Sequence, residues 1–146
     1  MSIKIAESDA ELARAGDVLL ELRPAFTKDA LIAQIKEQQR SGYRVAYLES
    51  AGEVLCVAGF VVGTKLAWGK HLYVDDLVTA ERHRSTGAGK RMLDWLKAHA
   101  LAVGCRQLQL DSGVQRFGAH RFYLREGFHI SSHHFAITDL DASKST

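Results

Sequence analysis

The sequence predicts an α/β fold in one domain, with a mixed central sheet of about six strands flanked by four helices. Three observations support this fold class. Short apolar runs typical of strands alternate with segments of helical periodicity. Helix caps, glycines and one proline separate these segments. The 146 residues, 47% of them apolar, are enough to form one core and contain no low-complexity tract.

Capping signals predict the N-terminal elements. A first strand is expected at residues 3–6. The tetrapeptide Ser8-Asp9-Ala10-Glu11 is a capping-box pattern that opens a helix reaching Leu22. Pro24, the only proline, breaks the chain after this helix, and a second helix is expected over 28–40.

The middle of the chain predicts most of the sheet. Strands are expected at 43–48 and 54–62, joined by a turn at 50–53. The second of these strands is apolar on both faces, so it should be central. A further strand ends near Thr79, and a helix with one apolar stripe covers 88–103.

The C-terminal part predicts three more elements. A strand at 107–110 and a helix at 116–126 are followed by a last strand close to 129–134. Because no repeat or linker divides the chain, residues 1–140 are expected to form a single domain. Residues 141–146 are expected to form a flexible tail.

Composition limits the possible functions. Lys plus Arg exceed Asp plus Glu by only 19 to 17, which does not predict a nucleic-acid-binding surface. No apolar run is long enough to span a membrane, and the N-terminus lacks the pattern of a signal peptide. Cys56 and Cys105 lie in settings that favour reduced, unreactive thiols. These features predict a cytoplasmic protein without nucleic-acid or membrane partners.

The segment Arg84-Ser85-Thr86-Gly87-Ala88-Gly89-Lys90 is the most informative one for function. A basic, glycine-containing turn at a helix N-terminus presents backbone N–H groups beside positive charge. Such a turn suits a phosphate group, whereas the alternative interpretation is an ordinary solvated connection. Arg91 in place of Ser or Thr excludes a Walker loop, and Met92 excludes a dinucleotide fingerprint.

The remaining pattern, Arg-x-x-Gly-x-Gly from Arg84 onward, resembles the pyrophosphate loop of the GCN5-related N-acetyltransferases, which binds coenzyme A. Downstream, the run 119–128, with its Phe-Tyr and Gly-Phe pairs, is similar to the second signature of that family. The resemblance extends over about residues 73–135. It implies the acetyltransferase fold, acetyl-CoA as cosubstrate, and direct attack by a primary amine in a ternary complex.

The resemblance also implies which residues bind acetyl-CoA. The loop would hold the diphosphate, and backbone groups of the preceding strand would pair with the pantetheine arm like an added strand. Two residues of the downstream helix would lie beside the cosubstrate. The implied binding residues are Leu77, Val78, Thr79, Arg84, Ser85, Thr86, Gly87, Ala88, Gly89, Lys90, Arg116 and Ala119.

Three residues are candidates for proton transfer. A primary amine is mostly protonated near neutral pH, so it needs a base before it can attack a thioester. The resemblance implies an acidic residue in the strand, and we favour Asp75 over Asp76. Alternation would place the two on opposite faces unless a bulge intervenes, and a structural role for both is an equally strong interpretation. The resemblance further implies that Tyr123 protonates the leaving thiolate, while the alternative is that Tyr123 only packs in the core.

The acceptor is the part of the reaction that the sequence determines least. In the resembling family the break between the first two helices forms a wall of the acceptor pocket, so Arg23 and Phe26 are candidate substrate-binding residues. A simple connecting turn is the alternative. The run 119–127 also resembles aminoalkylphosphonate acetyltransferases, which indicates small amines that carry an anion or only a shared cofactor-binding helix. The C-terminal histidines lack the helical spacing of metal ligands, so no metal is expected.

The sequence therefore predicts an N-acetyltransferase that acts on a small-molecule amine. A protein or peptide N-acetyltransferase is one alternative. A non-catalytic acyl-CoA-binding sensor domain is another. A homodimer is compatible with the expected fold, although no feature of the sequence requires one.

Overall fold

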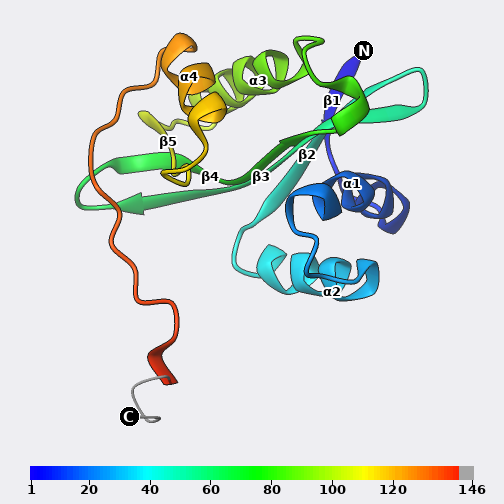
Figure 1. The fold of residues 1–146 in the computed structure, drawn as a ribbon, viewed down its shortest axis with the longest axis horizontal. Coiled ribbons are helices and arrows are strands. Elements are labelled where there is room, and N and C mark those ends of the chain that lie inside the picture. Colours follow the sequence, from blue (N-terminus) through cyan, green and yellow to red (C-terminus); the bar gives the residue numbers. More distant parts are fainter. Residues whose placement is uncertain (142–146) are drawn as a thin grey trace. The chain divides into compact units, whose positions relative to one another are not determined.

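The computed structural model describes residues 1–141 (Figure 1). These residues contain four α-helices and a mixed sheet of five strands. A short 3₁₀ turn, η1 (Glu81–His83), precedes the third helix. Residues 142–146 of the expected tail lie outside the described residues. In chain order the other elements are β1 (Ser2–Ile5), α1 (Asp9–Leu22), α2 (Lys28–Gln39), β2 (Arg44–Ser50), β3 (Glu53–Lys65), β4 (Gly69–Thr79), α3 (Ala88–Ala102), β5 (Gln107–Leu110) and α4 (Phe117–Arg125).

The chain divides into two compact units, residues 1–110 and the segment from Asp111 onward. The first unit holds the whole sheet together with α1, α2 and α3, and the second holds α4. The predicted single domain, residues 1–140, spans both units.

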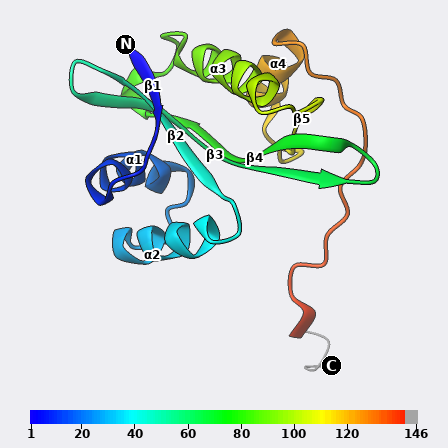
Figure 2. The same cartoon turned by 180° about the vertical axis from the view of Figure 1, so that it is seen from behind.

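The sheet has the order β1-β2-β3-β4-β5 and is antiparallel except for the parallel pair β4–β5. The apolar strand β3 lies in the middle, as predicted. Helices α1 and α2 lie on one face of the sheet and α3 lies on the other, which Figures 1 and 2 show from opposite sides. Each face is therefore buried by apolar helix residues, such as Leu12 and Leu19 of α1 and Met92, Leu93 and Leu96 of α3.

The helices begin where the capping signals predict. Ser8 accepts a hydrogen bond from the backbone of Glu11, and the Glu11 side chain accepts one from Ser8, which completes the capping box of α1. Thr27 Oγ1 accepts a hydrogen bond from Ala30 N at 3.2 Å and so caps α2. These side chains satisfy amides that a helix N-terminus leaves without partners.

The prediction of a sixth strand close to 129–134 is wrong for the part of the chain that is described. Residues 129–139 form no strand there, and Ile130, Phe135 and Ile137 are exposed. Ile130 is the one apolar residue among residues 129–134, so this segment lacks the alternation of a half-buried strand. A strand also needs a neighbour whose backbone completes the ladder, and no strand of the described residues pairs with this segment.

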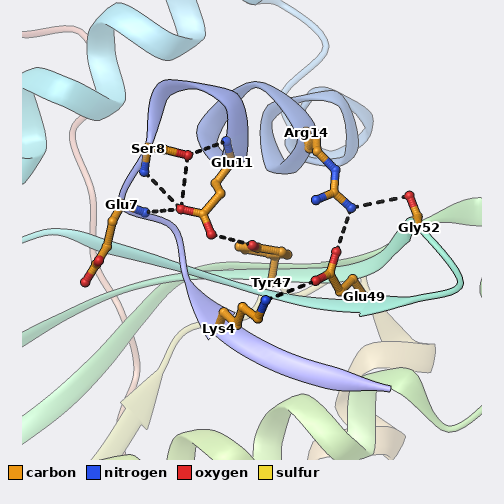
Figure 3. A network of polar contacts seen from close by, with 8 residues as sticks. All are labelled: Lys4, Glu7, Ser8, Glu11, Arg14, Tyr47, Glu49 and Gly52. Atoms are coloured by element: carbon orange, nitrogen blue, oxygen red, sulfur yellow. Dashed lines mark hydrogen bonds and ion pairs between the residues drawn. The ribbon is translucent and has the colours of Figure 1, made fainter.

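The N-terminal half of α1 is attached to the sheet through Glu11 (Figure 3). Glu11 accepts a hydrogen bond from the Tyr47 hydroxyl at 2.6 Å, in addition to its contacts with Ser8. The hydrogen bond from Tyr47, followed by those from the Ser8 and Glu7 backbone, lowers the pKa of Glu11 to about 2. Burial and the nearby Glu11 raise the pKa of Tyr47 to about 12.

Arg14 makes a second attachment on the same side of the sheet (Figure 3). Its Nη2 donates to Glu49 Oε2 at 2.7 Å and to the carbonyl of Gly52 at 3.3 Å. The guanidinium also lies over the Tyr47 ring, 5.8 Å from the ring centre, which links the two attachments. The group is called the Glu11–Glu49 network below, and its members are Glu11, Arg14, Tyr47 and Glu49.

Candidate active site

The predicted phosphate-binding turn lies between η1 and the N-terminus of α3. Gly87 is the N-cap residue and has a left-handed backbone with φ 84°. The first backbone hydrogen bond of α3 runs from Arg91 N to Gly87 O at 3.1 Å. The amides of Ala88 and Gly89 come before it and have no carbonyl within the helix to donate to. This terminus therefore presents donors and the positive end of the helix dipole to an anion.

The residues of the turn are exposed, whereas Ala88, the first residue of α3, is buried. Arg84, Ser85 and Thr86 are exposed, and Ser85 also has a positive φ of 65°. The Thr86 hydroxyl donates to the carbonyl of His83 at 2.6 Å and so stabilises the turn. A Cβ at Gly87 would have no atom within 4 Å, so glycine is needed there for its backbone and for access rather than for internal packing.

The second half of β4 has an open edge. Strand β5 pairs with β4 only from His71 to Val74, so from Asp75 onward no strand of residues 1–110 lies along the edge of β4 that faces away from β3. Ala80 N donates to Leu55 O at 2.8 Å. In the antiparallel ladder of β3 and β4, the backbone groups of every second residue of β4 therefore point toward β3. By that alternation the backbone groups of Val78 point toward β3.

The backbone groups of the two residues beside Val78 point the other way. Leu77 and Thr79 therefore present amides and carbonyls to the edge that β5 leaves open. Strand β5 pairs with no residue of β4 beyond Val74, and the binding roles of Leu77, Val78 and Thr79 stay predictions.

A bulge interrupts β4 at the two acidic residues. Gly59 pairs with Asp76 and Phe60 pairs with Val74, so Asp75 is the extra residue without a partner on β3. A bulge of this kind removes the simple alternation of faces. Asp75 and Asp76 both influence groups on the α1 side of the sheet, because the charges of both raise the pKa of Tyr43.

Asp76 is held on both of its carboxylate oxygens. Oδ1 accepts from Arg23, with Nε at 3.0 Å and Nη2 at 2.8 Å, and Oδ2 accepts from the Tyr43 hydroxyl at 2.6 Å. Only 14% of the Asp76 side chain is exposed. Burial, followed by the charge of Asp76, raises the pKa of Tyr43, so this phenol stays protonated as the donor. Arg23, Tyr43 and Asp76 are called the Asp76 network below.

Asp75 differs from its neighbour. Its residue is exposed, and within residues 1–141 its carboxylate accepts no hydrogen bond. The protein around the carboxylate partly desolvates it, and the charge of Asp76 adds to this effect, so the pKa of Asp75 is raised. A carboxylate that is accessible, without hydrogen bonds and shifted toward neutral pH has the properties of a general base.

The two predicted substrate-binding residues lie in different settings. Arg23 is the C-cap residue of α1, and besides Asp76 it binds the main-chain carbonyl of Asp75 at 3.3 Å. Phe26 lies in the connection between α1 and α2 and is 38% exposed.

The other predicted site residues belong to the second unit. Arg116 is the N-cap residue of α4, and Ala119 and Tyr123 follow one turn apart on that helix. The Tyr123 ring contacts Phe122 and Phe128, with ring centres 5.5 Å and 5.7 Å away.

Two residues of the site were missed by sequence reasoning. Tyr43 was assigned only to the start of a strand. Gly59 lies under its ring: a Cβ at Gly59 would be 1.7 Å from the Tyr43 hydroxyl oxygen. A glycine inside an apolar strand is a recognised sign of a bulge or of close approach, and that sign was available in the sequence.

No group of three or more His, Cys, Asp and Glu side chains among residues 1–141 is arranged to hold a metal ion. No helix in the described part of the chain is both long and apolar enough to cross a membrane.

Comparison with known proteins gives consistent matches. The model of the acetyltransferase (GNAT) family matches residues 13–128. The uncharacterized N-acetyltransferase YhdJ of Bacillus subtilis (strain 168) is 31% identical over 135 residues, which cover 91% of this chain and 95% of that protein. The aminoalkylphosphonate N-acetyltransferase of Salmonella typhimurium is 35% identical over 65 residues, which cover 44% of this chain and 41% of that protein.

Solved structures share the fold. The structure of AAC(6')-Iy in complex with the bisubstrate analog CoA-S-monomethyl-acetylneamine has a TM-score of 0.79 at 14% identity, and the match covers 94% of this chain and 97% of that one. Since the family model spans most of the sequence and one relative matches it along nearly its whole length, this chain belongs to the acetyltransferase (GNAT) family and is an acyltransferase whose cosubstrate is acetyl-CoA.

Proposed function

We propose that the protein transfers the acetyl group of acetyl-CoA to a primary amine of a small molecule, by direct attack in a ternary complex. The bulge of β4 is the observation that carries the proposal. It puts an accessible carboxylate, Asp75, immediately before a strand edge that no strand of residues 1–110 covers. A proton acceptor therefore adjoins a backbone edge that can take up an extended chain.

The residues of the first unit fit acetyl-CoA. The amides at the start of α3 suit its diphosphate, and Arg84 adds a positive charge beside them. Leu77 and Thr79 offer backbone donors and acceptors to the amide groups of the pantetheine arm, while Val78 bonds with β3. Arg116 and Ala119 enter this part of the proposal through their positions in the second signature.

In the reaction, Asp75 accepts a proton from the acceptor ammonium, directly or through a water molecule. The neutral nitrogen then forms a bond to the thioester carbonyl carbon, which gives a tetrahedral intermediate. When this intermediate collapses, the carbon–sulfur bond breaks and the nitrogen releases its second proton to solvent, from which Tyr123 regains the proton that it gives to sulfur. A backbone N–H of the open edge is suited to stabilise the negative oxygen. Tyr123, through its motif position, donates a proton to the leaving thiolate.

The chemical class of the amine acceptor is proposed from the similarity to a relative. The similarity to the aminoalkylphosphonate N-acetyltransferase supports a small amine that carries an anionic group. Phe26 is a candidate contact for the acceptor, because it lies exposed in the connection between α1 and α2.

A screen for acetyl-CoA-dependent thiol release tests the proposal. The panel includes amino acids, aminophosphonates, polyamines, aminoglycosides and peptides. Release with small amines is expected, and Tyr123→Phe should lose most turnover while its affinity for acetyl-CoA changes little. Release only with peptides would favour a protein acetyltransferase. Binding of acetyl-CoA without thiol release from any amine would favour a sensor domain and contradict the proposal.

The phosphate-binding turn has its own test. Gly87→Val should weaken acetyl-CoA binding strongly in a calorimetric titration, because the side chain would stand where the diphosphate approaches. Gly52→Val is a matched control: Gly52 has a similar φ of 80°, and a Cβ there would also meet nothing within 4 Å. Equal affinities of the two variants would argue against this turn as the binding site.

A further inference from the structure

We propose that the Asp76 network positions the base. It holds the bulge of β4, and it thereby fixes the position of Asp75 and of the unpaired β4 edge that follows it. This inference rests on the proposed role of Asp75 as the acceptor-side base. It assigns Asp76 and Arg23 to positioning rather than to proton transfer and substrate binding.

The first argument is that the strand ladder does not hold the bulged residue. Asp75 has no partner on β3, and β5 pairs with β4 only as far as Val74. Its carbonyl is instead bound by Arg23 Nη2 at 3.3 Å, while the same guanidinium binds the Asp76 carboxylate. One planar side chain therefore fixes two successive residues of the bulge to the end of α1.

The second argument is the hydrogen bonding of Asp76. Its two oxygens are engaged by Arg23 and by the Tyr43 hydroxyl. Three donors already bind this carboxylate and only 14% of the side chain is exposed, so an ammonium has poor access to it. Gly59 makes the contact with Tyr43 possible, because any larger residue would collide with the phenol.

The third argument is electrostatic. Two charged groups act on Asp75: Asp76 on the same strand raises its pKa, and Arg23 at the end of α1 lowers it. The Tyr43 phenol, which precedes β2, stays neutral because burial and Asp76 raise its own pKa. The network therefore also balances the charge felt by the base.

The charges give a test with opposite signs. Asp76→Asn removes a negative neighbour, so the pKa of Asp75 should fall and the acid limb of the kcat/KM profile should move to lower pH. Arg23→Gln removes a positive neighbour, so the pKa of Asp75 should rise and the acid limb of the kcat/KM profile should move to higher pH. The pKa is measured directly by carbon-13 NMR titration of the Asp75 carboxyl group. Shifts of the same sign, or none, would overturn the proposal.

Two charge-conserving variants test the geometry. Arg23→Lys keeps the charge but loses the fork, and Tyr43→Phe loses one donor to Asp76. Both should lower kcat on the order of tenfold, with little change in KM for the amine, because a small displacement of a catalytic group is costly. Backbone amide exchange at Asp76 and Val78 should become faster. A rise in the amine KM alone would instead make Arg23 a substrate-binding residue and refute the positioning role.

The matched controls come from the Glu11–Glu49 network. Arg14→Lys and Tyr47→Phe remove the same kinds of contact from the other half of α1, and they should change neither the Asp75 titration nor kcat. The titration and amide exchange need no acceptor. If they behave as expected while no amine is acetylated, the proposed role of Asp75 as a base fails, whereas the Asp76 network still holds the bulge and the carboxylate of Asp75.

Discussion

Helix α1 is attached to the sheet by the same chemistry in both of its halves, and the two attachments differ in what lies beside them. In each, a buried tyrosine hydroxyl donates to a carboxylate at 2.6 Å: Tyr47 to Glu11, and Tyr43 to Asp76. In each, an arginine of the helix region binds a strand carboxylate and also a main-chain carbonyl, at 3.3 Å in both cases.

Both networks also lie near a bulge. Between β2 and β3 the register shifts at Glu49, and the extra residue is Leu55, which is buried with 6% exposure. Between β3 and β4 the extra residue is Asp75, which is exposed and acidic. The two bulges therefore differ in their extra residue, which is the buried, apolar Leu55 in one and the exposed, acidic Asp75 in the other. The extra residue, rather than the polar network, separates a structural site from a candidate active site.

The largest effect that can test this comparison is on turnover. Asp75→Asn should lower kcat by about 10²- to 10⁴-fold, the usual range for loss of a general base. Glu49→Gln, a change of the same kind in the other network, should leave kcat within about twofold, since Glu49 is bound by Lys4 and Arg14 and by none of the proposed site residues. Steady-state thiol release measures both. Comparable losses of kcat in the two variants would show that the two bulges do not differ in function.

A smaller effect is expected on stability. Gly59→Ala would place a Cβ 1.7 Å from the Tyr43 hydroxyl oxygen, so the ring must move and its bond to Asp76 is lost. Forced packing of this kind costs about 1–3 kcal/mol in the free energy of unfolding. Gly63→Ala on the same strand is the control, because its Cβ would meet His71 only at an ordinary 3.7 Å. Urea unfolding of the two variants should separate them.

The smallest effect concerns pH. The pKa of Glu11 is lowered to about 2 from 4.5, so its contribution to stability is present above pH 4.5 and is lost as the pH falls toward 2. Glu11→Gln should remove that part of the acid dependence of unfolding. The raised pKa of Asp75 acts in the opposite direction, so Asp75→Asn should not destabilise the protein at neutral pH. Unfolding curves at a series of pH values check both signs.

Several features of the site could be predicted because their causes are local. The capping box at Ser8, the cap at Thr27 and the glycine at the start of α3 depend on a few adjacent residues, and the structure has all three. The apolar faces of β3 predicted its central place for a similar reason. The assignment of Asp75, Tyr123 and the acetyl-CoA-binding residues to their roles stays a prediction.

Other features could not be predicted because they depend on distant residues. The contact of Tyr43 with Asp76 joins residues 33 positions apart, and that of Arg23 with Asp76 joins residues 53 positions apart. The bulge at Asp75 is a property of the pairing with β3 and not of β4 alone. The expected strand near 129–134 was wrong on the same ground, since this segment pairs with no strand in the described structure.

The sequence by itself determined the order of the elements from β1 to α4, the caps of α1 and α2 and the glycine turn before α3, because backbone preferences and capping bonds act between neighbouring residues. Only the tertiary structure decided which of two adjacent aspartates is held and which is accessible. That choice depends on the register of β3 against β4 and on the end of α1, where Arg23 and Tyr43 meet Asp76. These are long-range contacts, and the free energy that selects them comes from packing the whole sheet against its helices.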